Sequence, residues 1–208
     1  MARVVLLDLD ETLIDKSYHL SIPRDELVSM IKKCEESGIK IGLCSDSPLL
    51  TLQTWARNLK LTGPIVFEQG AGWYNPESRS EFQIILGNVD WFSELRRRVV
   101  LAMLDRIPNW AIYVGDSVEL IRSEAKFPGS FDHFLLLNNQ RKYSFSAHVR
   151  AHDSLTGALS LDLEVLRNVR LMVEALAREL TTEPLDIDEN PKYGVLIIHV
   201  TRNTKASS

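Results

Sequence analysis

The segment RVVLLDLDETLID, residues 3–15, sets the expected architecture of this chain. It begins with a run of aliphatic side chains at residues 4–7, which predicts a strand buried on both faces, as in a parallel sheet. Asp8 and Asp10 follow at the carboxyl end of this strand, and Thr12 comes two residues later. Because ligands of open α/β sheets bind outside the carboxyl ends of the strands, this acid pair is placed for chemistry rather than for packing.

The next fifty residues continue the same pattern of strands and helices. A helix is expected between Pro23, which suits a helix start, and Gly38, which suits a helix end, and residues 39–44 predict a second strand. Pro48 suits the first position of another helix. The order strand, helix, strand, helix predicts a parallel sheet with right-handed crossovers.

Ser45 ends the second strand and is the next candidate for a functional site. It would lie at the same edge of the sheet as Asp8 and Asp10, beside the N-terminus of a helix, where anions bind readily. The alternative is that Ser47 is simply the N-cap of that helix and Ser45 a loop residue.

The pattern Asp-x-Asp-x-Thr after a hydrophobic strand resembles the first motif of the haloacid dehalogenase-like phosphatases. The resemblance implies that Asp8 is a nucleophile that forms an aspartyl-phosphate, and that Asp10 protonates the leaving group and then activates water. It also implies a Mg²⁺ ion held by Asp8 and by the backbone carbonyl of Asp10, and a phosphate ester held by Thr12 and Ser45. Without that chemistry, the acid pair would be a surface turn after a buried strand.

The rest of the chain resembles the cap-bearing branch of this family. Residues 63–71 are similar to the P-x-I-x-E-N-G-A stretch of Cof-type and sucrose-phosphatase-like members, with Gln69 where Asn is usual. Residues 88–200 predict the order α-β-β-α-β-β, and the segment RKYSFSAHVR, residues 141–150, is similar to a cap strand of trehalose- and sucrose-phosphate phosphatases. The expected fold is α/β, a Rossmann-like core with a parallel sheet and an inserted α+β cap. The core would span residues 1–75 with 201–208 returning to it, and the cap residues 76–200.

The family also needs a lysine for the phosphoryl group and a Gly-Asp motif for the metal, and two placements compete. In the favoured one, Lys205 is the phosphate-binding lysine and the final metal-binding acid lies beyond residue 208. In the other, Gly115-Asp116 is the final motif at the end of a core strand, and an arginine of residues 96–98 replaces the lysine. Under the first placement the strand at residues 4–7 becomes a hydrophobic edge, which a partner chain or a continuing reading frame should cover.

Composition narrows the class of protein. The chain has 208 residues, a net charge of -4 and no long apolar run, so neither nucleic acid nor a membrane is an expected partner. Cys34 and Cys44 are expected to be buried free thiols in a reducing cytosol, which predicts a cytoplasmic protein. His148 and Arg150 lie on the polar face of a predicted strand and could contact substrate, although solvated roles are the simpler interpretation.

The function predicted from these features is Mg²⁺-dependent hydrolysis of a small-molecule phosphate ester, such as a sugar phosphate, through an aspartyl-phosphate. Asp8 and Asp10 would be catalytic and hold the metal, while Thr12, Ser45 and Lys205 would bind substrate. A phosphomutase, an inactive fragment and an interaction module are the alternatives. Self-association as a homodimer, or association with a complementing chain, stays open.

Overall fold

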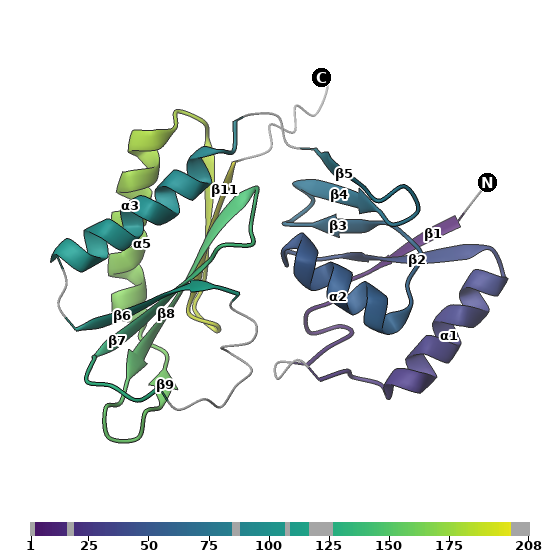
Figure 1. Ribbon diagram of the computed structural model, residues 1–208, viewed down its shortest axis with the longest axis horizontal. Helices are drawn as coiled ribbons and strands as arrows, with labels where there is room; N and C mark the ends of the chain where they lie inside the picture. Colours follow the sequence, from purple (N-terminus) through teal and green to yellow (C-terminus); the bar gives the residue numbers. More distant parts are fainter. Residues whose placement is uncertain (1–2, 16–18, 85–87, 107–108, 117–126, 201–208) are drawn as a thin grey trace. The chain divides into compact units, whose positions relative to one another are not determined.

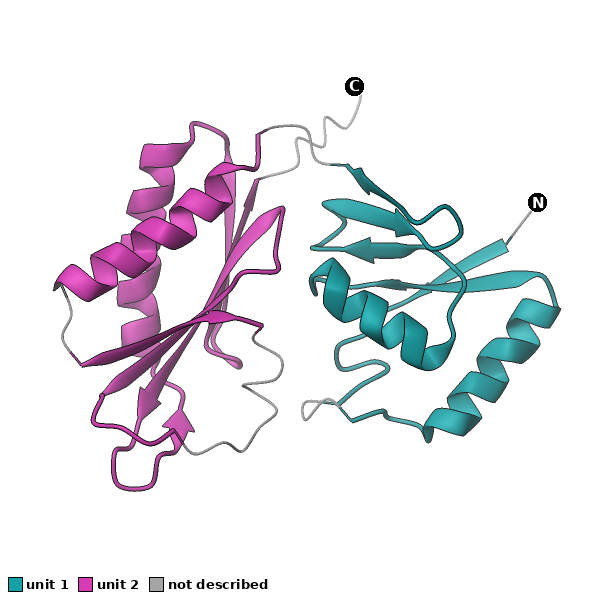
Figure 2. Ribbon diagram, in the orientation of Figure 1, with its two compact units in different colours: residues 1–86 teal, residues 87–208 magenta. Residues whose placement is uncertain are grey.

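The computed structural model describes residues 3–15, 19–84, 88–106, 109–116 and 127–200. The chain divides into two compact units, Met1–Leu86 and Gly87–Ser208 (Figure 2). The predicted boundary after residue 75 falls in the turn between two strands of the first unit. Residues 201–208, predicted to return to the core, lie outside the described residues together with Lys205.

The first unit is built on one five-stranded sheet with the order β1-β2-β3-β4-β5 (Figure 1). β1 with β2 and β2 with β3 are parallel, whereas β3 with β4 and β4 with β5 are antiparallel. This confirms the predicted parallel arrangement of the first two strands, and β3 continues it. The elements are β1 (Arg3–Leu7), α1 (Arg24–Glu36), β2 (Ile39–Cys44), α2 (Leu49–Leu59), β3 (Ile65–Phe67), β4 (Gly72–Asn75) and β5 (Ser80–Gln83).

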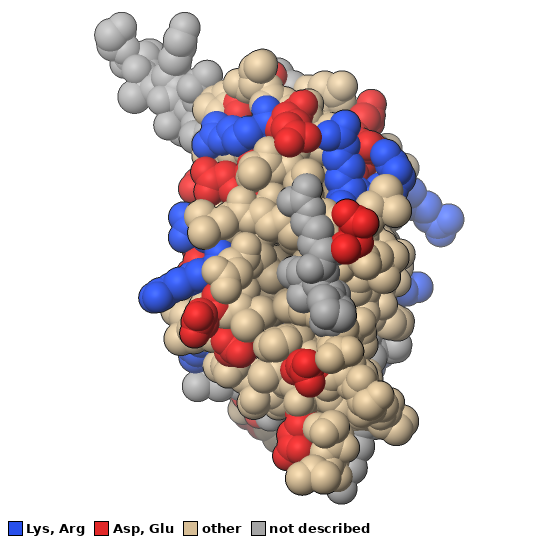
Figure 3. Space-filling model, turned by 90° about the vertical axis from the view of Figure 1, so that its left-hand side faces the viewer, with Lys and Arg blue, Asp and Glu red and all other residues tan. Residues whose placement is uncertain are grey.

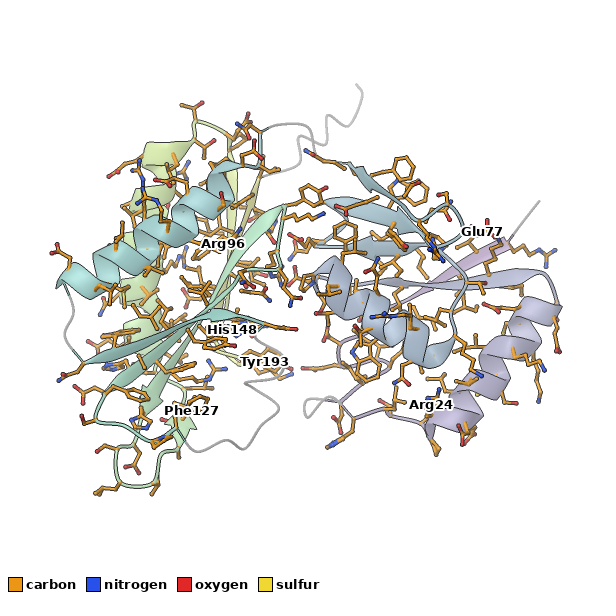
Figure 4. The ribbon with its side chains drawn as sticks, in the orientation of Figure 1. Arg24, Glu77, Arg96, Phe127, His148 and Tyr193 are labelled. Carbon is orange, nitrogen blue, oxygen red and sulfur yellow. The ribbon has the colours of Figure 1, made fainter. Side chains whose placement is uncertain are left out.

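Local signals in the sequence account for the helices of this unit. α1 begins directly after Pro23 and ends before Gly38, whose φ of 79° is a left-handed conformation that favours glycine. Arg24 ties the start of α1 to the end of α2, because its Nε donates to the side-chain oxygen of Asn58 at 2.8 Å and its Nη2 to the Asn58 carbonyl at 2.9 Å (Figure 4). α1 contacts β2, α2 contacts β2 and β3, and the two helices contact each other.

β1 differs from the prediction of a strand buried on both faces. Val4, Val5 and Leu6 are 47%, 43% and 42% exposed. Within the described residues β1 has a strand partner on one side only, β2, so the predicted hydrophobic edge is confirmed. The prediction of burial was wrong for a physical reason. An aliphatic run shows that a strand is suited to burial, but the burial itself depends on neighbouring strands and helices from elsewhere in the fold.

The second unit has a five-strand path, β10-β11-β8-β7-β6, with the short β9 paired to β8. β6 and β7 are parallel and the other pairs are antiparallel. The predicted order α-β-β-α-β-β was wrong in its strand count, because four strands, β6 to β9, lie between the two helices where two were predicted. Its elements are α3 (Trp91–Arg106), β6 (Trp110–Gly115), β7 (His133–Asn138), β8 (Ser144–His152), β9 (Leu159–Ser160), α5 (Leu163–Leu180), β10 (Leu185–Asn190) and β11 (Val195–Val200).

The core of the second unit lies between its sheet and the helices α3 and α5. Alternate residues of the strands point into it, as expected for a sheet covered by helices on one face. Asp162 is the N-cap of α5, and its carboxylate accepts the Val165 amide at 3.0 Å. The core residues from the strands are Leu135, Leu137, Phe145, Ala147, Val149, Leu196, Ile198 and Val200, and those from α3 and α5 include Phe92, Leu95, Val99, Leu166, Val169 and Val173.

The pairing of β6 decides between the two placements of the final motif. β6 pairs in parallel with β7, so it belongs to the sheet of the second unit and does not pair with β1. The alternative that made Gly115-Asp116 the end of a core strand beside residues 4–7 is therefore wrong. The accompanying suggestion that an arginine of residues 96–98 replaces the phosphate-binding lysine also loses support. Arg97 and Arg98 form ion pairs with Glu94 on the same helix.

Charged side chains of both signs share the surface of the second unit. Lys and Arg lie beside Asp and Glu on the face shown in Figure 3. Arg98 of α3 also reaches Glu179 of α5 at 3.1 Å, which links the two helices. None of the helices in the described part of the chain has the length and apolar content that a membrane span requires.

Candidate active site

A single helical turn after β1 sets the directions of the two acids. The amides of Leu13 and Ile14 both donate to the carbonyl of Leu9, at 3.0 and 3.1 Å. Leu9 and Ile14 are fully buried and anchor the turn. Asp8 is therefore left exposed at the end of the strand, while Asp10 is partly buried.

Asp8 is held by donors from its own loop. Its Oδ1 accepts the Leu9 amide at 2.9 Å, and its Oδ2 accepts the Thr12 hydroxyl at 3.0 Å. Thr12 was predicted to bind substrate, and the structure gives its hydroxyl a contact with Asp8. The result is an oriented carboxylate with access to solvent, which is what a nucleophile at this edge requires.

Asp10 accepts two hydroxyl groups from the loop that follows β2. Its Oδ2 lies 2.8 Å from the Ser45 hydroxyl and 3.3 Å from the Ser47 hydroxyl. Burial raises the pKa of the Asp10 carboxyl above its ordinary value of 3.8; the two hydroxyl groups oppose this shift, and the charges of Asp8 and Asp46 add to it. A carboxyl group with a raised pKa keeps its proton to a higher pH than an ordinary aspartate, so more of it is available as a proton donor.

The loop between β2 and α2 therefore brings Ser45 to the acid pair, as the parallel arrangement predicted. Ser47 joins it, although the sequence pointed only to a helix cap at this position. α2 has Pro48 at its N-cap and no side-chain cap hydrogen bond, so the interpretation of Ser47 as a cap was wrong. The spacing of two serines at i and i+2 after a strand was the signal that could have identified it.

A tight turn follows the carboxyl end of β3, at the edge of the sheet where Asp8, Asp10 and Ser45 also lie. Glu68, Gln69 and Gly70 have φ values of 48°, 56° and 76°, so consecutive residues adopt the left-handed conformation. The turn places the Glu68 amide 3.3 Å from the carbonyl of Ser47. β3 thus supports the serine loop from its far side, in addition to the bond from the Ser45 amide to the Val66 carbonyl at 3.1 Å.

The residues that form this site lie within a segment that matches a known protein family. Residues 5–84, nearly the whole first unit, match the family model of haloacid dehalogenase-like hydrolases. Over these residues the chain is similar to the haloacid dehalogenase-like hydrolases. No match was found among curated proteins.

Solved structures share the fold over almost the whole chain. A haloacid dehalogenase-like hydrolase from Bacteroides thetaiotaomicron aligns with a TM-score of 0.55 and 14% identity, covering 97% of this chain and 72% of that one. The C-terminal domain of trehalose-6-phosphate phosphatase from C. albicans aligns with a TM-score of 0.55 and 10% identity, covering 95% and 57%. A subclass IIB sugar phosphatase aligns with a TM-score of 0.51 and 11% identity, covering 97% and 71%. At these identities the likeness concerns the fold.

The donors at the acid pair suit part of a magnesium centre. Asp8 and Asp10 provide hard oxygen atoms, and Asp8 is exposed. The described residues contain no cluster of three or more His, Cys, Asp or Glu side chains arranged for a metal. Magnesium commonly retains several waters and is held by one or two carboxylates together with substrate phosphate, so the two aspartates fit such an ion.

Arg150, a candidate on β8 of the second unit, and His152 on the same strand have structural contacts. The Arg150 Nη1 donates to the carbonyls of Val149 and Gly194 at 2.7 and 3.1 Å, and burial lowers the pKa of this guanidinium. The Nδ1 and Nε2 atoms of His152 each lie 2.8 Å from a carbonyl oxygen, those of Phe131 and Phe127. His152 therefore uses both ring nitrogens in the fold. Phe127 and His148 are labelled in Figure 4.

Proposed function

We propose that this chain hydrolyses a small phosphate monoester through an aspartyl-phosphate on Asp8. The observation that carries the proposal is the different environment of two carboxylates at one strand end. Asp8 is exposed and oriented by Thr12, whereas Asp10 is partly buried, is contacted by two serine hydroxyl groups and has a raised pKa. A nucleophile beside an acid is the arrangement that this reaction requires.

Asp8 would attack phosphorus with a carboxylate oxygen, and the bond from phosphorus to the ester oxygen would break. The departing alkoxide would take a proton from Asp10. Water would then attack the phosphorus of the aspartyl-phosphate while Asp10 accepts a proton from it. Inorganic phosphate would leave, and both carboxyl groups would return to their starting states. Acid and base help of this kind contributes about 10²- to 10⁴-fold in rate.

Ser45 would hold a phosphoryl oxygen, with Lys205 as a second contact to the same group. Magnesium, bound by the carboxylate of Asp8 and the backbone carbonyl of Asp10, would neutralise negative charge on the phosphoryl oxygens. The second unit would act as a cap that excludes water and selects the substrate. A sugar phosphate is the proposed substrate class, supported by the shared fold of sugar and trehalose-6-phosphate phosphatases.

The test uses the purified 208-residue chain with p-nitrophenyl phosphate and magnesium. Hydrolysis is expected, and it should stop on chelation of the metal. Asp8→Asn should abolish hydrolysis and the trapping of a labelled aspartyl-phosphate, with an unchanged circular dichroism spectrum. Turnover retained by Asp8→Asn would contradict the proposed nucleophile.

A second candidate rests on the free edge of β1. Val4, Val5 and Leu6 are exposed there, and among the described residues no third metal-binding side chain joins Asp8 and Asp10. The chain would then be a catalytically incomplete domain that a complementing polypeptide completes by adding a strand to β1. A folded chain that binds phosphate but hydrolyses no ester would favour this candidate over the first.

A further inference from the structure

The hydroxyl groups of Ser45 and Ser47 converge on one oxygen of Asp10. Ser45 Oγ lies 2.8 Å from Asp10 Oδ2, and Ser47 Oγ lies 3.3 Å from the same atom. The backbone amide of Ser47 also donates to Ser45 Oγ at 3.0 Å. Ser45 Oγ thus accepts one hydrogen bond and donates its only hydroxyl proton to the carboxylate.

This arrangement creates a conflict when phosphate is bound. A serine hydroxyl has one proton, so Ser45 cannot donate to Asp10 and to a phosphoryl oxygen with the same hydrogen bond. Ser45 must therefore release Asp10 when it binds the phosphoryl group. Among the contacts described above for Asp10, the Ser47 hydroxyl is then the one left to hold its carboxylate.

We propose that Ser47 is a positioning residue that keeps Asp10 in place while Ser45 binds the phosphoryl group. The proposal rests on the function proposed above, because it takes Ser45 as the phosphate ligand and Asp10 as the acid. The Ser47 hydroxyl is free for this task, since α2 is not capped by any side chain. Its backbone is fixed from both sides, by the amide contact to Ser45 and by the Glu68 amide, which donates to the Ser47 carbonyl at 3.3 Å.

The proposal predicts a dependence of phosphate affinity on a residue that does not touch phosphate. In Ser47→Ala, the Ser45 hydroxyl would turn from Asp10 to phosphate when phosphate binds. Asp10 would then be left with neither hydroxyl donor. A hydrogen bond to a charged group changes an equilibrium by about tenfold to one hundredfold. Inorganic phosphate should therefore bind about tenfold more weakly to Ser47→Ala, and Ser47→Thr, which retains a hydroxyl, should bind it nearly as the unaltered chain does.

A double-mutant cycle with Ser45 separates this role from a general effect on the loop. Titration calorimetry would measure inorganic phosphate binding to the unaltered chain, Ser45→Ala, Ser47→Ala and the double variant. In the Ser45→Ala background there is no Ser45 hydroxyl whose hydrogen bond could switch from Asp10 to phosphate, so removing the Ser47 hydroxyl should have no further effect. Ser37→Ala is the matched control, because the Ser37 hydroxyl donates to the Lys33 carbonyl at 2.9 Å within the same unit, at the end of α1.

Each outcome decides the proposal. Weaker phosphate binding in Ser47→Ala, rescue by Ser47→Thr and no effect of the second substitution in Ser45→Ala would support it. An unchanged affinity in Ser47→Ala, or an equal loss in both backgrounds, would overturn it while leaving the proposed function intact. If the unaltered chain binds no phosphate, or Ser45→Ala binds it equally well, the role of Ser45 in the proposed function fails as well.

Discussion

Replacement of Gly42 by alanine tests whether the close contact between β2 and β3 holds the serine loop in place. A Cβ atom at Gly42 would lie 2.0 Å from the carbonyl oxygen of Pro64 and 3.0 Å from Cδ2 of Leu6. The same Pro64 oxygen accepts the Leu43 amide at 3.1 Å. The methyl group therefore cannot enter unless the backbone of Pro64 moves away from β2.

The cost of this substitution can be worked out from those contacts. An ordinary contact of a Cβ atom begins near 3.4 Å, so the Pro64 carbonyl would have to move by more than an ångström. Overpacking of this kind costs about 1–3 kcal/mol, and the weakened bond from Leu43 to Pro64 adds about 1 kcal/mol. We expect Gly42→Ala to lower the free energy of unfolding of the first unit by about 2–4 kcal/mol.

Gly38, in the connection between α1 and β2, provides the control. A Cβ atom there meets nothing within 4 Å, but the φ of 79° remains unfavourable for alanine. Gly38→Ala should therefore cost only the left-handed backbone, about 1–2 kcal/mol. The comparison distinguishes a steric clash from the general effect of replacing a glycine.

Urea unfolding followed by tryptophan fluorescence measures both variants. Trp91 and Trp110 of the second unit would be replaced by phenylalanine, which leaves Trp55 and Trp73 as reporters of the first unit. The midpoint should fall further for Gly42→Ala than for Gly38→Ala, with similar slopes. Equal midpoints for Gly42→Ala and its parent would refute the reasoning, because Pro64 would then have moved at no cost.

Two further predictions concern stability. Burial raises the pKa of Asp10 above 3.8 in the folded chain, so its contribution to stability is fully present below that pH and is lost as the pH rises through the folded-state value. Asp10→Asn, which does not titrate, should become progressively more stable relative to the parent as the pH rises above 3.8 and through the raised pKa of Asp10, and a constant difference in urea midpoints would contradict this. His152→Ala removes both carbonyl contacts and the stacking on Phe131 at 3.8 Å, and should destabilise the second unit by about 2–4 kcal/mol. Hydrogen exchange of the β8 amides would measure the loss, and unchanged protection would argue against it.

The first unit was largely predictable because its signals are local. Pro23 and Gly38 marked the ends of α1, and the aliphatic runs marked β1 and β2. Parallel strands bring their carboxyl ends to one edge, so the meeting of Asp10 with Ser45 followed from the order of elements. Ser47 was missed because a serine before a proline is more often a helix cap, and only the folded loop shows where its hydroxyl points.

The parts that could not be predicted depend on partners distant in the chain. The strand at residues 110–115 has the same local pattern whether it joins the first sheet or the second, and its parallel pairing with β7 settles the choice. The exposure of Val4 and Leu6 has the same origin, because burial of a strand depends on what lies beside it. In the second unit the two helices and the two strands after α5 were predictable, but the number of strands between the helices and the way the strands pair were not.

The proposed division of labour between Asp8 and Asp10 would follow from residues that touch no substrate. Both acids stand in one short segment, yet the turn anchored by Leu9 and Ile14 exposes the first and partly buries the second. Exposure leaves Asp8 an available carboxylate, and burial gives Asp10 the raised pKa that an acid requires. If apolar anchoring sets these roles, Ile14→Ala should bring the two carboxyl environments closer together even though it removes no functional group.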